Sequence, residues 1–239
     1  KLKVLRRHTH THTHNIVSGR GNSLEMACRK LGRYEIDVCI LMETKLSGYH
    51  TVESSEFKIF ATKVTNKNKG GVALLYQKSE NFHIESLKCY GDNIVKATIV
   101  HRRQRTVIWG VYIPPSESNE ETMIKLDRAM KNKDLNKCVI IGDLNINYQS
   151  PSKKRDLEII ETLELYGMSN ISRKFKCQKN KSHRWTWQQT REGKKVRAIC
   201  DYIFSGGTVE WRNFVPIDIN FDTDHRLLTA KIISKGKNI

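Results

Sequence analysis

The stretch Cys138–Asn147 reads CVIIGDLNIN, and its change from apolar to polar residues decides how the chain is interpreted. A run of Cys, Val, Ile and Ile is typical of a short buried strand. The run passes directly into Gly142, Asp143 and Asn145, which a hydrophobic core does not need. Open α/β folds assemble their sites at strand ends, so we predict a site here. The alternative is a simple turn in which the Asp side chain bonds its own backbone.

Similar short runs, rich in β-branched residues, recur along the chain. These predicted strands are residues 36–42, 57–62, 71–76, 94–100, 106–113, 138–142, 199–204 and 227–233. Three helices are predicted, at residues 23–32, 119–131 and 153–166. Ser118 and Glu121 form a capping box before the second helix, whereas Ser152 precedes and Gly167 follows the third. Many strands with few helices between them indicate an α/β fold, with two packed sheets flanked by helices.

The composition suits a single globular domain. The chain has 239 residues, 38% of them hydrophobic, and no long low-complexity linker divides it. No apolar run is long enough to span a membrane, and the N-terminal residues KLKVLRRHTHTHTH lack the apolar core of a secretory signal. The six cysteines form no CxxC pair, so we expect a reduced, intracellular protein with neither a disulfide framework nor a zinc site.

The formal net charge of +17 indicates an anionic polymer as partner, with an anionic membrane surface as the second candidate. The basic residues cluster: residues 173–197 contain ten Lys or Arg and one acidic residue, with Trp185 and Trp187 among them. Cations interleaved with aromatic rings suit contacts with phosphates and bases. Residues 101–105 and 153–155 are weaker basic groups that are also consistent with turns. Solvated surface lysine remains the alternative.

Other predicted strands also carry polar residues at one end. Glu43 follows the run ILM, Tyr112 precedes Ile-Pro-Pro, and Asp201 lies in ICDYIF. Asp224 and His225 come just before the last strand. Taken singly, each of these is explained better by a loop start, a strand exit or a cap. Their recurrence in one basic chain indicates a shared site.

The order of these motifs is identified as that of the endonuclease/exonuclease/phosphatase superfamily, and the chain most resembles the endonuclease domains of LINE-type (non-LTR) retrotransposons. The motifs that carry the resemblance are NIVSGRG (15–21), ETKL (43–46), GGVALLY (70–76), YIPP (112–115), GDLNIN (142–147), WTW (185–187), DYIFSG (201–206) and DHRLL (224–228). The resemblance implies a four-layered α/β sandwich. It also implies hydrolysis of a DNA phosphodiester that depends on Mg²⁺, with Mn²⁺ as a substitute, and that leaves a 3′-hydroxyl and a 5′-phosphate.

The resemblance assigns catalytic roles to Asn15, Glu43, Tyr112, Asp143, Asn145, Asp201, Asp224 and His225. Glu43 and Asp224 are the expected metal carboxylates, since Mg²⁺ prefers a few oxygen ligands. Asp143 is expected to orient or deprotonate the attacking water. His225 is expected to stabilise phosphoryl charge, with Asp201 as its hydrogen-bonded partner.

Three further residues are expected to place the phosphate. Asn15 ends the expected first strand, Tyr112 offers its phenol, and Asn145 lies two residues after Asp143 on the same side of an extended segment. The expected nucleic-acid contacts are Thr186, Arg184, Trp185, Trp187, Lys181, Lys194, Lys195 and Arg197. Duplex DNA is the expected substrate, and we expect a monomer that acts in the nucleus and has no membrane partner.

The N-terminus departs from the family pattern, because an apolar first strand is expected to end at Asn15. The sequence has alternating His and Thr over His8–His14 instead, which places four imidazoles on one face of a strand. We take 1–14 as an atypical first strand, 15–233 as the single catalytic domain and 234–239 as a basic tail. Near the other end, Thr223 replaces the usual Ser before Asp-His and keeps the hydroxyl.

Two alternatives remain open. One is a nucleic-acid-binding or host-interaction module on the same scaffold, with catalysis weakened by the unusual N-terminus. The other is a hydrolase of the superfamily that acts on RNA, an inositol phosphate or a phospholipid, because the GDLN and DH motifs are common to those branches. The charge favours a polymeric substrate.

Overall fold

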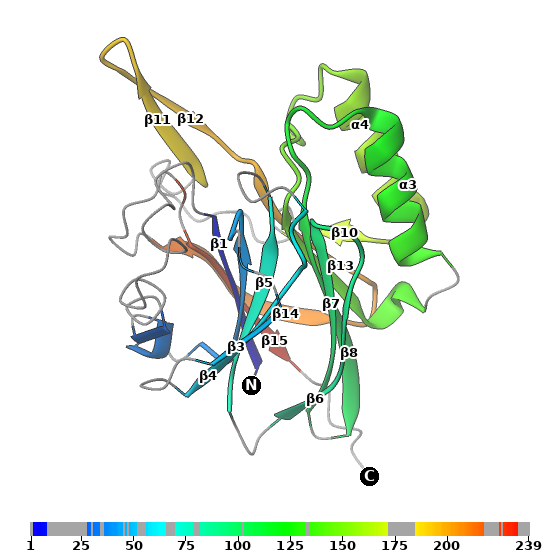
Figure 1. Ribbon diagram of the computed structural model, residues 1–239. Coiled ribbons are helices and arrows are strands. Elements are labelled where there is room, and N and C mark those ends of the chain that lie inside the picture. The colour runs from blue at the N-terminus through cyan, green and yellow to red at the C-terminus, as the bar shows by residue number, and fades with distance from the viewer. Residues whose placement is uncertain are drawn as a thin grey trace.

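The structure is a computed structural model of the 239-residue chain. It describes residues 2–8, 28–29, 31–33, 36–44, 46, 48–51, 56–65, 70–78, 82–101, 103–131, 134–171, 185–217, 225 and 227–233. Two mixed β-sheets pack face to face, and helices lie on their outer sides (Figure 1). The predicted α/β architecture is therefore confirmed. No helix among these residues has the length and apolar character needed to cross a membrane.

The first sheet has seven strands. In spatial order they are β14 (Glu210–Ile217), β15 (Leu227–Ile233), β1 (Leu2–His8), β2 (Val38–Met42), β5 (Val72–Gln77), β4 (Phe57–Ala61) and β3 (Gly48–Thr51). Strands β1 and β2 are parallel, and the remaining neighbours are antiparallel. The central strands of this sheet therefore come from both ends of the chain.

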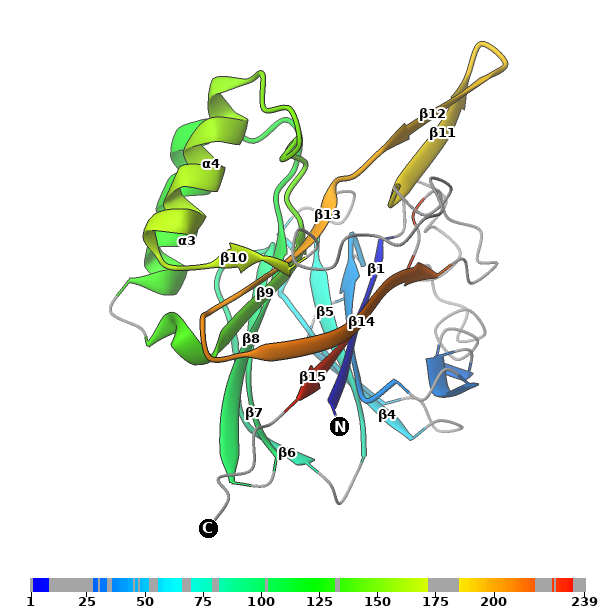
Figure 2. The same cartoon turned by 180° about the vertical axis from the view of Figure 1, so that it is seen from behind.

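The described residues form six strands in the second sheet, and among these only β8 and β9 pair in parallel. In spatial order they are β10 (Ser169–Asn170), β13 (Asp201–Ser205), β9 (Cys138–Asp143), β8 (Gln104–Tyr112), β7 (Ile94–His101) and β6 (Phe82–Cys89). A separate hairpin of β11 (Trp187–Arg191) and β12 (Lys194–Ala198) projects away from both sheets (Figures 1 and 2).

Both faces of the central strands are covered, which explains their unbroken apolar runs. In β9, Val139 and Ile141 face the core between the two sheets, whereas Cys138 and Ile140 face the core beneath the helices. The helices over the second sheet are α3 (Asn119–Met130) and α4 (Lys154–Leu165), seen in green in Figure 2. On the far side of the first sheet, helical residues 28–29 and 31–33 contribute Cys28 and Leu31 to a third core.

The first strand differs from the prediction. It runs over Leu2–His8 and includes only the first residue of the His/Thr alternation, which was expected to form the strand. The apolar residues that suit a central strand lie in LKVL, and four imidazoles on a covered face would be costly. Since β1 lies between β15 and β2, residues 2–8 form a central strand of the first sheet, and the bounds expected for the domain stay a prediction. Residues 9–15 and the predicted tail 234–239 lie outside the described residues.

The helix starts follow the capping rules in one case and not in the other. Ser118 caps α3 and forms the predicted box with Glu121, whose side chain bonds the Ser118 backbone. By contrast, α4 begins after Lys153, which makes no side-chain cap, and not directly after Ser152. At its C-terminal end, Gly167 has φ +71°, as expected for the residue that ends a helix.

Each of the eight predicted strands is found within a few residues of its expected bounds. The sequence did not predict β3, β6, β10 and β14, and it indicated the β11–β12 hairpin only as a basic region. Strand β6 lies at a sheet edge and has one buried residue, Phe82, among partly and fully exposed ones, and β10 is only two residues long. Edge strands lack the continuous apolar signal of covered strands, so they are harder to recognise.

A glycine makes the pairing of β8 with β9 possible. A Cβ atom added to Gly142 would lie 2.0 Å from the backbone oxygen of Val111, which is its partner residue in β8. At Gly207, an exposed turn residue, an added Cβ would meet nothing within 4 Å. Only a hydrogen is therefore tolerated at position 142, where the polar end of β9 begins.

We expect Gly142→Ala to lower the free energy of unfolding by about 2–4 kcal/mol, because the two strands must separate to admit a methyl group. The matched change Gly207→Ala is expected to shift stability by about 0.5 kcal/mol or less in either direction. Urea denaturation followed by Trp fluorescence measures both. Equal effects of the two substitutions would contradict the proposed close approach.

Candidate active site

Three predicted site residues lie side by side at one end of the second sheet. Tyr112 pairs with Asp143 across β8 and β9, and Asp143 pairs with Asp201 across β9 and β13. Residues that are directly opposite in a sheet point to the same face. This is the inner face, because Tyr112 and Ile141, two residues before Asp143, belong to the core between the sheets. The apolar core thus passes directly into a row of polar side chains.

Asp143 shapes the loop that follows it. Its side chain is buried, and Oδ1 accepts a hydrogen bond from the backbone N–H of Asn145 at 2.9 Å. Asn145 has φ +47°, and its side-chain amide donates to the carbonyl oxygen of Ile113 at 2.9 Å. The segment is therefore not extended at Asn145, contrary to the prediction from the sequence. The simple turn considered as the alternative is present, and it fixes the Asn145 side chain beside the strand end.

Glu43 joins the two sheets. It follows β2 in the first sheet, and its Oε1 accepts a short hydrogen bond from the Tyr112 hydroxyl in the second sheet. Its φ of +51° is unusual for a residue with a side chain. The other described non-glycine residues with positive φ, apart from Asn145, are Arg103 and Glu192 in tight turns. Backbone strain of this kind is concentrated at functional sites.

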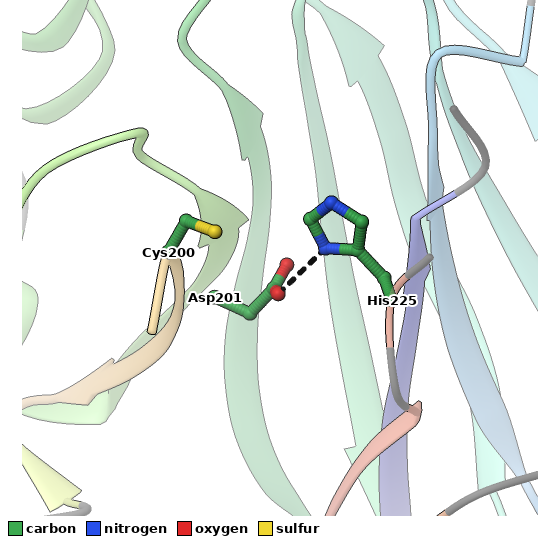
Figure 3. Close-up of side chains that lie close together, drawn as sticks. All are labelled: Cys200, Asp201 and His225. Carbon is green, nitrogen blue, oxygen red and sulfur yellow. Dashed lines mark hydrogen bonds and ion pairs between the residues drawn. The ribbon is translucent and has the colours of Figure 1, made fainter. Parts of the chain in front are cut away.

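His225 and Asp201 form a buried pair. The Nδ1 atom of His225 lies 2.8 Å from Oδ2 of Asp201, and both side chains are about 1% exposed. Figure 3 shows the imidazole with its Nδ1 toward the carboxylate and its other nitrogen directed away. A carboxylate on one ring nitrogen fixes the tautomer and stabilises the protonated form of the imidazole. The predicted partnership of these two residues is thus present in the structure.

The WTW motif holds this pair in place. Thr186 is buried, and its Oγ1 accepts hydrogen bonds from the backbone N–H groups of Cys200 and Asp201, each at 3.2 Å. The next residue, Trp187, forms an isolated antiparallel bridge with His225. Thr186 therefore has a structural role that the sequence did not reveal. Its contact with a phosphate stays a prediction.

Arg155 is a cation near the site that was not predicted from the sequence. Its guanidinium donates to the carbonyl oxygen of Pro114 at 3.1 Å and is half-buried. Burial lowers the pKa of Arg155, and the nearby carboxylates of Asp156, Glu117 and Asp143 oppose that shift. The only signal in the sequence is the weak basic group 153–155, which is also consistent with a turn.

The hydroxyl of Tyr202 forms hydrogen bonds with the loop after Asp143. This hydroxyl lies 2.9 and 2.7 Å from the carbonyl oxygens of Ile146 and Ile199, which share its one proton, and it accepts from the N–H of Tyr148 at 3.2 Å. Burial is the main cause that raises the pKa of Tyr202 above its usual value. The phenol therefore stays neutral and ties the 146–148 segment to the residues just before Asp201.

The β11–β12 hairpin carries the described part of the predicted nucleic-acid contacts. Lys194, Lys195 and Arg197 lie on β12, where every residue is exposed. The Arg197 guanidinium lies 5.1 Å from the Trp185 ring centre, and that of Arg191 lies 6.0 Å from the ring centre of Trp187. The hairpin thus presents cations and aromatic rings together beside the site. Lys181 and Arg184 lie outside the described residues.

Two predicted catalytic residues, Asn15 and Asp224, also lie outside the described residues. The first strand reaches the level of the site at His8. Its partner in β2 is Met42, the residue directly before Glu43. Asn15 was expected at this strand end, and that expectation stays a prediction. Every other predicted catalytic residue lies at the same end of the two packed sheets.

The donor chemistry of this end suits a hard divalent cation. Glu43 is partly exposed, and its carboxylate is hydrogen-bonded to Tyr112, whose strand partner is Asp143. Two carboxylates therefore flank one phenol, and all of these donors are oxygen atoms. Mg²⁺ favours such ligands and keeps several of its own waters. Glu43 is the described residue best placed to hold the ion.

Comparison with known proteins identifies the family of the chain. The model of the Endonuclease/Exonuclease/phosphatase family matches residues 17–225. The chain belongs to this family. Its fold matches the endonuclease domain of TRAS1, a telomere-specific non-LTR retrotransposon, with a TM-score of 0.74 at 15% identity, over 99% of this chain and 100% of the other. No curated protein matches the sequence.

Other solved structures of similar fold act on nucleic acid, according to their descriptions. An AP endonuclease from Archaeoglobus fulgidus matches with a TM-score of 0.70 at 16% identity, over 97% of this chain and 99% of the other. D. rerio TDP2, solved with a single-strand DNA product, matches with a TM-score of 0.67 at 16% identity, over 98% and 99%. At these identities the likeness establishes the fold, and the family prediction from the sequence is confirmed.

The role of Thr186 leads to a stability prediction. Thr186→Val keeps the shape but removes the acceptor of two buried N–H groups, so we expect a loss of about 1–3 kcal/mol in unfolding free energy. Thr186→Ser keeps the oxygen and is expected to retain most of the stability. Urea denaturation of the three proteins measures the difference. A serine variant as unstable as the valine variant would show that the methyl group, and not the hydroxyl, is what matters.

Proposed function

We propose that the protein is a metal-dependent endonuclease that hydrolyses phosphodiester bonds of duplex DNA, with Mg²⁺ as the ion and Mn²⁺ as a substitute. The observation that carries the proposal is the convergence of Glu43, Tyr112, Asp143, Asp201 and His225 at one end of two packed sheets. Family membership supports hydrolysis of phosphoesters. The net charge of +17 and the basic hairpin support an anionic polymer over a small phosphoester. A nuclear site of action follows from this substrate.

The chemistry required is the addition of water to an anionic phosphorus centre and the departure of an alkoxide. A bound divalent ion supplies charge neutralisation on the phosphate oxygens. Asp143 is the group placed to orient or deprotonate the attacking water, because it lies in the centre of the polar row. His225, held by Asp201, offers Nε2 as a donor to the charge that develops on the phosphate. Tyr112 positions Glu43.

Plasmid nicking tests this proposal most directly. Wild-type protein with Mg²⁺ is expected to convert supercoiled plasmid to open circles, and EDTA is expected to stop the reaction. Asp143→Asn and His225→Ala each remove a proton-transferring or charge-stabilising group, so each is expected to slow nicking by about 10²–10⁴-fold. Lys137→Gln, at the opposite end of β9, serves as the control and is expected to retain the wild-type rate.

The Asp201–His225 pair allows a sharper test. If the two residues act as a unit, the double variant Asp201→Ala/His225→Ala is expected to nick no more slowly than the slower single variant. Additive losses would show independent roles. Absence of open-circular product above the Asp143→Asn background, with DNA binding retained, would refute the endonuclease and leave a binding module.

The hairpin leads to a prediction about DNA affinity. Lys194→Gln/Lys195→Gln is expected to weaken duplex binding, and to reduce the slope of log K against log salt by about 0.9 for each phosphate that is no longer neutralised. Lys131→Gln/Lys137→Gln removes the same charge from exposed positions beyond α3 and before β9 and is the matched control. Fluorescence anisotropy at several salt concentrations measures both slopes. Equal slopes would exclude the hairpin as a principal DNA-binding surface.

A further inference from the structure

A cysteine lies directly beside the buried Asp201–His225 pair. The Sγ of Cys200, a carboxylate oxygen of Asp201 and a ring nitrogen of His225 all lie within 4.8 Å of one another. Figure 3 shows the carboxylate in the middle, with the thiol on one side and the imidazole on the other. Within the described part of the chain, this is the one group of three such donors. It differs from the oxygen donors around Glu43 in offering sulfur, nitrogen and oxygen.

The backbone holds these three donors in fixed positions. The N–H of Cys200 donates to Thr186 Oγ1 at 3.2 Å, and its carbonyl oxygen accepts from the N–H of Leu144 at 3.2 Å. Asp201 begins β13, and His225 is bridged to Trp187. Two consecutive residues of the WTW motif thus fix both sides of the cluster. Donors held in this way lose little entropy when they bind an ion.

One of the three residues of the cluster is accessible to solvent. Asp201 and His225 are buried, whereas Cys200 is partly exposed. The other described buried thiols, Cys28, Cys39 and Cys138, belong to apolar cores. Cys200 is therefore a thiol that an ion from solvent can contact, and a carboxylate and an imidazole lie next to it.

We propose that Cys200, Asp201 and His225 form a second metal site, which takes a thiophilic divalent cation of the Zn²⁺ class and inhibits the enzyme. Zn²⁺ binds thiolate at about 2.3 Å and imidazole or carboxylate at about 2.0–2.2 Å, so small side-chain rotations bring the three atoms onto one ion. Water completes the tetrahedron. Mg²⁺ prefers oxygen ligands and does not compete well for a thiolate.

Binding changes the protonation of the cluster. The Cys200 thiol loses its proton to solvent as the S–Zn bond forms. The ion takes the place of the proton between Nδ1 of His225 and Oδ2 of Asp201, and the neutral imidazole then keeps its one proton on Nε2. One proton is released per ion when His225 starts neutral. The imidazole bound to the ion no longer gains the positive charge that the proposed hydrolysis requires of it, so this inhibitory effect rests on the proposed function, whereas ion binding does not.

Cobalt substitution tests the site without reference to catalysis. Co²⁺ bound by thiolate gives a sulfur-to-cobalt charge-transfer band in the near ultraviolet, which nitrogen and oxygen ligands do not produce. The His8–His14 segment also offers ligands to such ions, but it contains no sulfur. Titration of wild-type protein with Co²⁺ is expected to produce the band, and Zn²⁺ is expected to remove it.

Variants identify the ligands. Cys200→Ser is expected to abolish the band, whereas Cys89→Ser, which alters an exposed thiol, is expected to leave it unchanged. His225→Ala is expected to weaken Co²⁺ binding by about tenfold or more, since even changes to residues that only support a ligand lower metal affinity about 10–100-fold. Circular dichroism confirms that each variant is folded. A band that persists in Cys200→Ser, or no band in wild type at saturating Co²⁺, would overturn the proposal.

Inhibition is measured separately. With Mg²⁺ in excess, Zn²⁺ is expected to reduce plasmid nicking by the wild type, and to reduce that of Cys200→Ser much less relative to its own zinc-free rate. A cobalt band in a protein without nicking activity would support the metal site and refute only the nuclease. Nicking activity without a thiolate band would support the nuclease and refute only the metal site.

Discussion

The alignment of the ends of β8, β9 and β13 is the constraint on which the rest of this site depends. β8 and β9 end in register with the start of the antiparallel strand β13, so that Tyr112, Asp143 and Asp201 form one row on the inner face of the second sheet. The two sheets pack over a continuous apolar core, and that core ends at this row. A shift of one residue in β9 would turn Asp143 to the helix-covered face and an apolar side chain into the site.

The register of these strands is maintained by one glycine and by two hydroxyl groups. Gly142 permits the close approach of β9 to Val111, and the hydroxyl of Tyr202 ties the loop after Asp143 to Ile199. Thr186 bonds the two N–H groups at the start of β13. The two hydroxyl groups satisfy backbone groups and fix a strand end at the same time. The site is therefore rigid on the side of the second sheet, and Glu43 reaches it from the first through the Tyr112 hydroxyl.

The chemistry of the site is divided between two regions. Around Glu43 and Asp143 the donors are oxygen atoms that suit a hard ion, whereas Cys200, Asp201 and His225 offer a mixed set that suits a softer one. Asp201 belongs to the polar row and also binds the imidazole, so it couples the two regions. Arg155 and the basic hairpin add positive charge around them, in keeping with an anionic substrate.

The sequence by itself determined the architecture and most of the residues that matter. Runs such as VCILM and CVIIG predicted covered strands, because only strands buried on both faces are apolar throughout. The ordered motifs from ETKL to DHRLL predicted the family, which the matching family model confirms. Edge strands were missed, and the first strand was expected to extend through the His/Thr alternation, since alternating or mixed sequences carry little local signal.

Only the tertiary structure decided which residues meet. Asp143 and Asp201 are far apart in the chain, and strand register places them opposite one another. The same holds for Glu43 with Tyr112 and for Arg155 beside the site. No local pattern specifies these contacts, because they arise from strand register within a sheet and from the packing of separate elements on one another. The role of Thr186 as a backbone acceptor, and the position of Cys200 beside the imidazole, were decided in the same way.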